Sequence, residues 1–436
     1  MSSPNQKFIY LHFVDGSSGN NNNKFYKMEV GSNGSTWTAT YGREGAAKPA
    51  TETYPMSKWE TKYKEKIKKG YTDVTEFKTV IKESKSSARN SNGQIISKDP
   101  EVVKLIEFLQ NLSNNLTKAN YDVEARSVTQ SQIDTAQKQI NLLFDIFKEF
   151  GTNKFSFDNF NKELTKLYII IPRKMKNVSD HLFASHSKKE TVIKKLEDEQ
   201  DLLDSMASQV TTNTATDEEE SEVNETTLIE SLGLEMSIVT DAREIANVKS
   251  NCQTHGHKIN RVFRVVNKKA QERFDKSLAK ANNKTTRLLW HGSRSVNWIS
   301  ILQNSLIIRP SGVAYSGSAF GDGIYFASED DKSMGYTDGG RWNNTSRGNY
   351  VYMALFNVHV GKQYIIYDNK TLSSKSTSAS KEVLKKAGDC DSTWARKAAD
   401  RPKDTSNNWG YGLQREELIV YNSDQCTISY LIEFKV

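Results

Sequence analysis

Residues 288–336 read LLWHGSRSVNWISILQNSLIIRPSGVAYSGSAFGDGIYFASEDDKSMGY, and the rest of the chain is best understood as support for them. An apolar run with strand character is followed by four residues that offer different chemical groups. They are the imidazole of His291, the backbone of Gly292, which carries no side chain, the hydroxyl of Ser293 and the guanidinium of Arg294. Groups at the end of a strand can converge on a ligand. A lone histidine after a strand is more often structural, so a functional role for His291 depends on its neighbours in the sequence.

The second half of the stretch supplies more polar and aromatic groups. A helix is expected over 296–302, and a loop rich in Ser, Gly and Pro over 304–318 could cover a small molecule. Two glycines then allow close backbone approach before a short β-prone run that places Tyr325. Ser333 and Tyr336 lie on the next expected helix. Together these motifs predict a catalytic pocket.

The order and spacing of these motifs resemble the catalytic domain of the poly(ADP-ribose) polymerases. The matching segments are HGSR at 291–294, FGDGIYFA at 320–327, Ser-x-x-Tyr at 333–336 and REELIVY at 415–421. The family carries a His-Tyr-Glu signature and uses NAD+ as its substrate. The resemblance therefore implies an enzyme that breaks the nicotinamide–ribose bond and transfers ADP-ribose to proteins.

The resemblance also assigns roles to single residues. The adenosine end of NAD+ is assigned to His291, Ser293 and Asn297. The nicotinamide ring is assigned to Tyr325 and Tyr336, and its carboxamide to Gly292 and Ser333. An amide needs donors and an acceptor at fixed angles, which a glycine backbone and a hydroxyl supply, and a flat cationic ring stacks well between tyrosines.

Two adjacent carboxylates, Glu416 and Glu417, begin a strand near the C-terminus. Neighbours on a strand point to opposite faces, so only one of them can enter the pocket. Spacing to the Leu-Ile-Val-Tyr run matches Glu417 to the family's catalytic glutamate. With His291 and Tyr325 it completes the implied catalytic triad, in which Glu417 hydrogen-bonds the ribose and polarises an acceptor hydroxyl.

The chain departs from the family pattern in four places. Ile307 stands where relatives commonly have an arginine, Ser300 where they have a glycine, and Ala319 where long-chain synthesisers carry a bulky apolar residue. The chain also stops at Val436, without the tail that relatives use for an accessory factor. These differences put acceptor handling and polymer length in doubt, while NAD+ cleavage is unaffected.

Composition excludes several classes of protein. A chain of 436 residues with 36% hydrophobic and 26% charged residues should hold two or three domains. Three unpaired cysteines predict a reducing compartment, and the absence of a signal peptide or a long apolar run predicts neither secretion nor a membrane span. Of the net charge of +7, residues 1–97 hold 15 Lys and Arg against 9 Asp and Glu, which places polyanion binding at the N-terminus.

Residues 1–85 are expected to form a small β-rich domain. Runs at 8–14 and 24–30 predict a hairpin, and a basic helix over 56–69 ends at a glycine. This order resembles the WGR domain of DNA-damage-responsive members of the family, with tyrosine in place of the name-giving tryptophan. The DNA contacts implied are stacking by Tyr41 and phosphate contacts by Arg43, Lys62, Lys66 and Lys69. The alternative is a small β domain with a merely solvated basic helix.

The expected fold is multi-domain α+β. Residues 86–97 form a polar linker, residues 98–212 a helical bundle resembling the family's regulatory domain, and residues 213–226 an acidic linker. Residues 227–436 form a mixed α/β ADP-ribosyltransferase domain with antiparallel sheets. Cys252, His255 and His257 offer potential zinc ligands, but no second cluster lies nearby, so no metal is expected.

These features predict a poly-ADP-ribosyltransferase activated by DNA strand breaks. Its partners would be broken DNA and acceptor proteins, itself included, with no membrane; it would be nuclear in a eukaryote and cytoplasmic or nucleoid-associated in a bacterium. A mono-ADP-ribosyltransferase and an inactive DNA-end-binding scaffold stay open as alternatives. A dinucleotide-dependent oxidoreductase is disfavoured, because the glycines of 317–323 lack the GxGxxG spacing.

Overall fold

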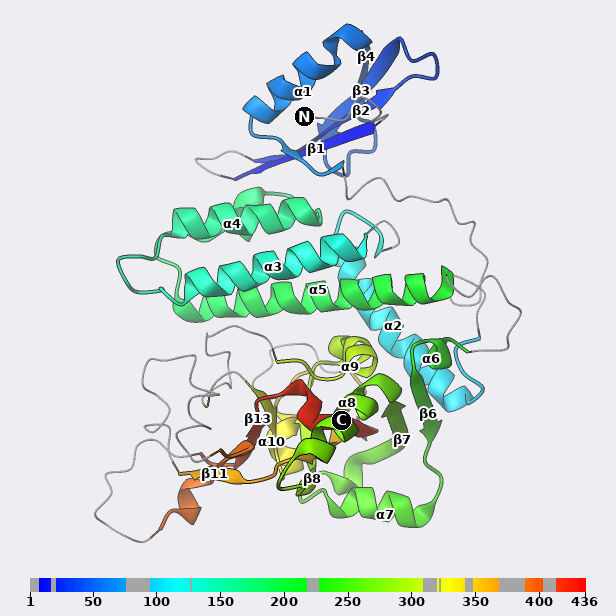
Figure 1. Ribbon diagram of the computed structural model, residues 1–436, viewed down its shortest axis with the longest axis vertical. Helices are drawn as coiled ribbons and strands as arrows, with labels where there is room; N and C mark the ends of the chain where they lie inside the picture. The colour runs from blue at the N-terminus through cyan, green and yellow to red at the C-terminus, as the bar shows by residue number, and fades with distance from the viewer. Residues whose placement is uncertain are drawn as a thin grey trace. The chain divides into compact units, whose positions relative to one another are not determined.

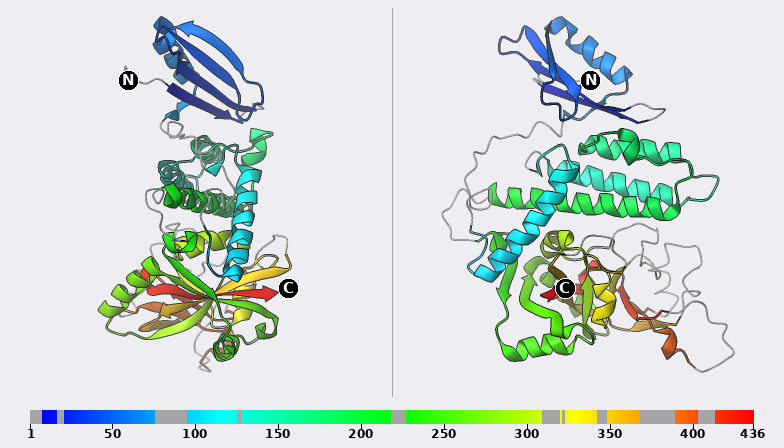
Figure 2. Two further views of the ribbon diagram at one scale, coloured as in Figure 1. Left: turned by 90° about the vertical axis from the view of Figure 1, so that its right-hand side faces the viewer. Right: turned by 180° about the vertical axis from the view of Figure 1, so that it is seen from behind.

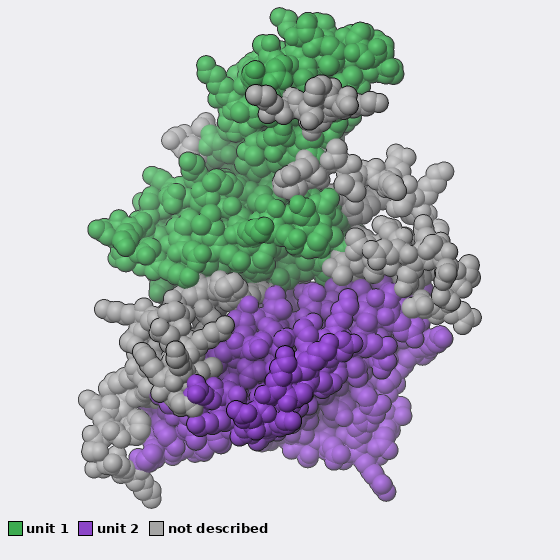
Figure 3. Space-filling view, in the orientation of Figure 1, with its two compact units in different colours: residues 1–85, 114–213 green, residues 86–113, 214–436 purple. Residues whose placement is uncertain are grey.

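The computed structural model describes ten stretches of the chain. They are residues 8–16, 21–75, 95–125, 128–217, 227–308, 320, 323–341, 348–367, 389–402 and 413–436. These residues fall into two compact units, Met1–Lys85 with Asn114–Asn213 and Ser86–Ser113 with Thr214–Val436. Figure 3 colours the two units separately. The units cut across the domain boundaries expected from sequence, so those boundaries stay a prediction.

The N-terminal module is a five-stranded antiparallel sheet in the order β4-β3-β2-β1-β5. Its strands are β1 Phe8–Asp15, β2 Asn22–Val30, β3 Thr36–Arg43, β4 Ala50–Pro55 and β5 Thr72–Asp73. The predicted hairpin is confirmed by the pairing of β1 with β2. Helix α1, Trp59–Lys68, covers one face of this sheet (Figures 1 and 2) and buries Trp59 against Trp37. The predicted helix ends just before Gly70, as expected. Gly70 has a φ of +88°, a left-handed backbone conformation that glycine adopts without steric cost and that ends a helix.

The helical part of the first unit is built on α3 Gln130–Phe147, α4 Phe157–Ile170 and α5 Lys189–Asp217. The predicted capping box of Thr129 and Gln132 opens α3, and the predicted apolar stripe of this helix is buried. Helix α5 continues to Asp217, into the stretch that composition marks as a linker. The rest of that linker and most of the one at 86–97 lie outside the described residues.

The second unit contains two sheets. The five-stranded sheet is antiparallel in the order β6-β7-β14-β10-β8, and the four-stranded sheet has the order β11-β12-β13-β9 with one parallel pair, β11 and β12. The strands are β6 Leu234–Ile238, β7 Ile259–Asn267, β8 Thr286–Gly292, β9 Ile324–Phe326, β10 Tyr350–His359, β11 Gln363–Ile366, β12 Ser392–Ala395, β13 Glu417–Val420 and β14 Cys426–Lys435. The helices are α6 Leu228–Ser231, α7 Ala242–Ser250, α8 Lys268–Lys280, α9 Trp298–Asn304 and α10 Asp330–Met334.

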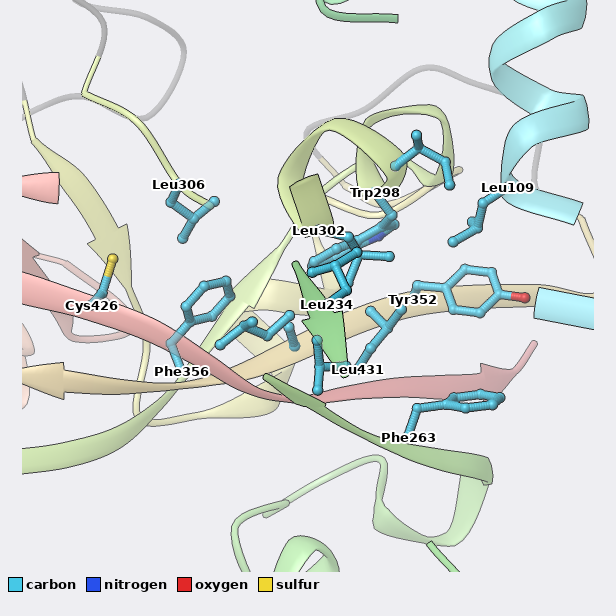
Figure 4. Close-up of a cluster of buried hydrophobic side chains, with 14 of the residues drawn as sticks. Leu109, Leu234, Phe263, Trp298, Leu302, Leu306, Tyr352, Phe356, Cys426 and Leu431 are labelled. Atoms are coloured by element: carbon cyan, nitrogen blue, oxygen red, sulfur yellow. The ribbon is translucent and has the colours of Figure 1, made fainter. Parts of the chain in front are cut away.

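Helix α2, Pro100–Asn120, contains the boundary between the units. Its first half belongs to the core of the second unit, where Leu105 and Leu109 are fully buried. Figure 4 shows Leu109 beside Trp298 and Tyr352. The predicted stripe on this helix is thus buried at its start, while Leu112 and Leu116 are half-buried. Apolar burial of this kind contributes about 1.5–3 kcal/mol for each large side chain, so this half of α2 is an integral part of the second unit.

Polar contacts strengthen the same attachment. Arg261 on β7 donates to Glu101 on α2 at 2.8 Å and to Glu433 on β14 at 2.6 Å. Glu433 is fully buried and also accepts from the hydroxyl of Tyr352 at 2.8 Å. The Arg261 and Tyr352 donors hold the pKa of Glu433 below its usual value, against the effect of burial. A charge at this depth is stable because its oxygens are satisfied.

Candidate functional site

The ends of β8 and β9 meet where the two sheets of the second unit join. Trp290 and Ala327 exchange backbone hydrogen bonds of 2.8 and 2.9 Å, which bridges the sheets. As a result His291 and Tyr325, far apart in sequence, become neighbours. The Nδ1 of His291 lies 3.0 Å from the carbonyl oxygen of Tyr325.

The environment of His291 selects one form of its ring. A carbonyl can only accept, so Nδ1 carries the proton and Nε2 is left as a hydrogen-bond acceptor. Burial lowers the pKa of His291, and the rings of Phe326 and Phe356 meet it edge-on. The histidine is therefore neutral near pH 7 and suited to accept from a hydroxyl, as the expected ribose contact requires.

Gly292 and Ser333, the expected carboxamide pair, are brought together. A Cβ built on Gly292 would lie 1.9 Å from the carbonyl oxygen of Ser333, so no residue but glycine fits without moving α10. Ser333 is itself buried. Nearby, Asn297 donates to the hydroxyl of Ser293 at 3.2 Å, which places two of the three residues expected at the adenosine end beside each other.

The two expected aromatic walls lie on different elements. Tyr325, in the middle of β9, lies opposite Ile419 of β13 and packs against the cluster to which that residue belongs, and its hydroxyl accepts from the backbone of Phe320 at 2.9 Å. Tyr336 lies just after α10, and its backbone N–H donates to Ser333 at 3.1 Å. Burial, and then the charge of Glu417, raise the pKa of Tyr336 well above its usual value. Tyr336 is therefore a neutral ring close to Glu417.

The adjacent glutamates have different surroundings. Glu416 accepts hydrogen bonds from Ser328 and, at 2.9 Å, from the indole of Trp394, so both of its oxygens are engaged. Glu417 pairs through Oε1 with Lys332 at 2.5 Å, while its buried Oε2 has no hydrogen-bond partner among the residues that the structure describes. Burial raises the pKa of Glu417, and Lys332 acts in the opposite direction. An unpartnered buried carboxylate oxygen is costly in a folded protein and is typical of a functional site.

Lys332 is the site residue that sequence reasoning missed. It is only 13% exposed, pairs with Glu417, and lies next to Ser333 on the short helix α10. The sequence did offer one indication of its role, because Lys332 directly precedes Ser333, which was expected to bind the carboxamide. Its partner, however, is 85 positions away, and only the folded chain shows the pair.

Two of the three possible zinc ligands, His255 and Cys252, have surroundings that do not favour a metal. His255 hydrogen-bonds Asp330 at 2.9 Å, and burial raises the pKa of the Cys252 thiol to about 12, which disfavours the thiolate that binds metals. Within the described stretches, no group of three or more His, Cys, Asp or Glu residues could hold a metal ion. The departure at Ala319 lies outside those stretches.

On the N-terminal module, two of the residues expected to bind DNA, Tyr41 and Lys66, lie in one aromatic and basic cluster. The ring of Tyr41 stacks on Tyr26 at 5.6 Å, and the ammonium of Lys66 lies 4.0 Å from the Tyr26 centroid and 5.9 Å from that of Tyr41. Burial lowers the pKa of Lys66. Lys62 and Lys69 both pair with Glu65, at 3.5 and 2.6 Å.

Arg43 was expected to contact a DNA phosphate, but in the structure it hydrogen-bonds other groups of the protein. Its guanidinium donates to the carbonyls of Met175 at 2.8 Å and Lys176 at 3.0 Å, and to Asn21 at 2.9 Å. Asn21 in turn accepts from the backbone of Val178 at 3.0 Å. Arg43 therefore joins the small β module to the segment after α4, within the first unit.

Two family profiles match the chain. The Poly(ADP-ribose) polymerase catalytic domain matches residues 240–436, and the WGR domain matches residues 7–78. Both matches coincide with the parts that carry the clusters described above. The fold and the site thus define an NAD+-dependent ADP-ribosyltransferase with a nucleic-acid-binding WGR domain.

Individual relatives agree. A poly(ADP-ribose) polymerase-like protein, 100L, of Invertebrate iridescent virus 6 is 34% identical over 173 residues, which is 39% of this chain and 83% of the viral protein. Human poly(ADP-ribose) polymerase 2 is 32% identical over 155 residues, 34% of this chain and 26% of the human one. Human protein mono-ADP-ribosyltransferase PARP3 is 27% identical over 217 residues, 47% of this chain and 38% of the human one. The chain belongs to the poly(ADP-ribose) polymerase family.

Proposed function

We propose that this enzyme is a poly-forming ADP-ribosyltransferase that DNA strand breaks activate. The observation that carries the proposal is Glu417, whose Oε2 is buried without a partner in the described structure while Oε1 is held by Lys332. Mono-transferring relatives usually lack this carboxylate, so its presence favours polymer formation. The acceptors are proteins, including the enzyme itself, and the expected location is the nucleus in a eukaryote or the cytoplasm and nucleoid in a bacterium.

In the proposed mechanism, NAD+ is the substrate and each residue has a separate task. Gly292 and Ser333 orient the carboxamide, Tyr325 and Tyr336 flank the nicotinamide ring, and the other end of NAD+ is held by His291, Ser293 and Asn297. Loss of nicotinamide leaves a ribose with cationic character. The carboxylate of Glu417 stabilises this charge, hydrogen-bonds the ribose and polarises the incoming acceptor hydroxyl.

The ion pair of Lys332 with Glu417 predicts a shift in pH dependence. Glu417 acts in its ionised form, so activity falls as pH drops through its pKa, which burial raises and Lys332 lowers. In Lys332→Met that opposing charge is gone, the pKa of Glu417 rises further, and the acidic limb of kcat moves to higher pH. Initial rates measured across pH test this. Lys397→Met, which breaks a pair with Glu329 instead, is the matched control; an unmoved limb in Lys332→Met would contradict the assigned role of Glu417.

DNA binding is expected to combine stacking with phosphate neutralisation. Tyr41→Ala should weaken binding to nicked duplex by about 1–3 kcal/mol without altering the salt dependence. Lys69→Ala should make the slope of log K against log salt shallower by about 0.9, because one phosphate contact is lost. Titrations on nicked and intact duplex at several salt concentrations measure both quantities. Equal losses on both duplexes for Tyr41→Ala would mean that Tyr41 is only a core residue.

Arg43 is expected to behave differently from the lysines. Because its guanidinium already donates to Met175 and Lys176, Arg43→Ala should leave the salt slope unchanged and instead reduce stimulation of activity by DNA. A slope shallower by about one unit in the same titrations would show that Arg43 leaves these carbonyls for a phosphate.

The products formed from NAD+ test the proposal as a whole. Mass spectrometry with and without nicked duplex DNA should show free nicotinamide and protein-linked ADP-ribose polymers, with more of both in the presence of DNA. Single ADP-ribose units would indicate the mono-transferring alternative. DNA binding without nicotinamide release would indicate an inactive scaffold.

A further inference from the structure

Asp330, the first residue of α10, is fully buried, and its carboxylate accepts hydrogen bonds from another segment of the chain. Oδ1 accepts from the backbone of Gln253 at 2.8 Å and of Thr254 at 3.1 Å. Oδ2 accepts from the backbone of His255 at 2.6 Å and lies 2.9 Å from its ring Nδ1. Because the N-cap of α10 is Glu329, capping the helix does not explain these bonds.

The bond to Asp330 determines how His255 is presented. A carboxylate accepts, so Nδ1 of His255 carries the proton and Nε2 is the nitrogen turned away from Asp330. The ring lines a cavity of about 480 Å³ together with Lys332, Arg341, Gln414 and Arg415. Lys332, which lines this cavity, also pairs with Glu417, so a single residue connects the cavity to the carboxylate to which acceptor handling is assigned.

The segment that carries His255 is hydrogen-bonded to two other parts of the second unit. The carbonyl of Asn251 accepts from the indole of Trp290 at 2.9 Å, just before His291, and the side chain of Gln253 donates to the carbonyl of Ser328 at 3.3 Å. The remaining bonds come from Asp330. His255 is thus fixed relative to β8 and to α10, the elements that carry His291, Gly292 and Ser333.

We propose that Asp330 is a positioning residue for the transfer step, acting through His255, whose ring it holds at the cavity where the acceptor group binds. The proposal rests on the proposed function, which places the acceptor beside Glu417. Misplacing a group by about 1 Å can lower a rate by about 100-fold, so a rigid anchor has a measurable role. NAD+ itself is held by other residues, so its binding and its hydrolysis by water do not depend on Asp330.

Asp330→Asn in the full chain tests this, because its amide nitrogen would face the donors of His255 where a carboxylate oxygen now accepts. Two rates are measured on one preparation: nicotinamide released with water as acceptor, and ADP-ribose incorporated into protein. Transfer should fall by about 10- to 100-fold, with hydrolysis and the KM for NAD+ within about twofold of the parent enzyme. Asp241→Asn, at an aspartate that also accepts a backbone N–H but caps α7, should change neither rate.

The double variant Asp330→Asn/His255→Ala separates positioning from a general structural role. If Asp330 acts through His255, the double variant transfers as slowly as His255→Ala alone. Additive losses, or hydrolysis falling together with transfer, would overturn the proposal. If Asp330→Asn does not fold, the single variant His255→Ala tests the proposal instead. Unchanged ADP-ribose transfer in His255→Ala would also overturn the proposal. A parent enzyme that neither hydrolyses nor transfers would instead refute the proposed function.

Discussion

Glu417→Gln is expected to lower ADP-ribose transfer by about 10²- to 10⁴-fold while NAD+ still binds. Glutamine keeps the size and one acceptor oxygen, but it lacks the charge that stabilises the cationic ribose and polarises the acceptor hydroxyl. It also removes the negative charge that pairs with Lys332, whose side chain is 13% exposed. Transfer is measured as polymer length and as the initial rate of nicotinamide release, and binding by direct titration of NAD+.

Glu416→Gln is the matched control for this prediction. Glutamine retains an oxygen that can accept from Ser328 or Trp394, so we expect a modest loss of stability and near-normal transfer. The two variants differ by one position, and they alter carboxylates with different hydrogen-bond partners. Normal polymers from Glu417→Gln together with a crippled Glu416→Gln would show that the catalytic role belongs to Glu416.

Gly292→Ala is expected to have the second largest effect. Its new Cβ would lie 1.9 Å from the carbonyl oxygen of Ser333, which is backbone and cannot rotate away, so β8 and α10 must separate. Overpacking of this kind costs about 1–3 kcal/mol or more. Gly292 and Ser333 are both assigned to the carboxamide of NAD+. Because the substitution moves the groups that bind it, we expect the KM for NAD+ to rise by about 100-fold. Thermal melting and NAD+ titration measure the two effects.

Gly348→Ala supplies the comparison, since the nearest heavy atom to its new Cβ would be the Tyr350 carbonyl oxygen at 3.9 Å. Melting temperature and KM should then match those of the parent enzyme. A Gly292→Ala enzyme with the parent KM would mean that the carboxamide binds elsewhere.

Much of the fold could be predicted from local patterns. The alternation over 8–14 and 24–30 predicted a hairpin, and the pairing of β1 with β2 confirms it. The capping box before α3 was also predicted and is present. Such features depend on contacts within a few residues, and their energies act wherever the segment lies. The helix α5 instead runs past its expected end to Asp217, since composition is a weak guide to where a helix stops.

The sequence by itself determined the family and the residue types of the site, because the motifs around His291, Tyr325 and Glu417 are short and contiguous. The alternation of strand side chains also predicted that only one of Glu416 and Glu417 enters the pocket, although the strand itself begins at Glu417. Only the tertiary structure decided that Lys332 partners Glu417, that Asp330 holds His255, and that Arg43 binds the carbonyls of Met175 and Lys176. Each of these pairs joins segments at least 75 residues apart, as Asp330 and His255 show. The pairs of Lys332 and Asp330 depend on strand order and on the junction of two sheets, and those of Arg43 on how the β module packs against the segment after α4; no local pattern encodes either.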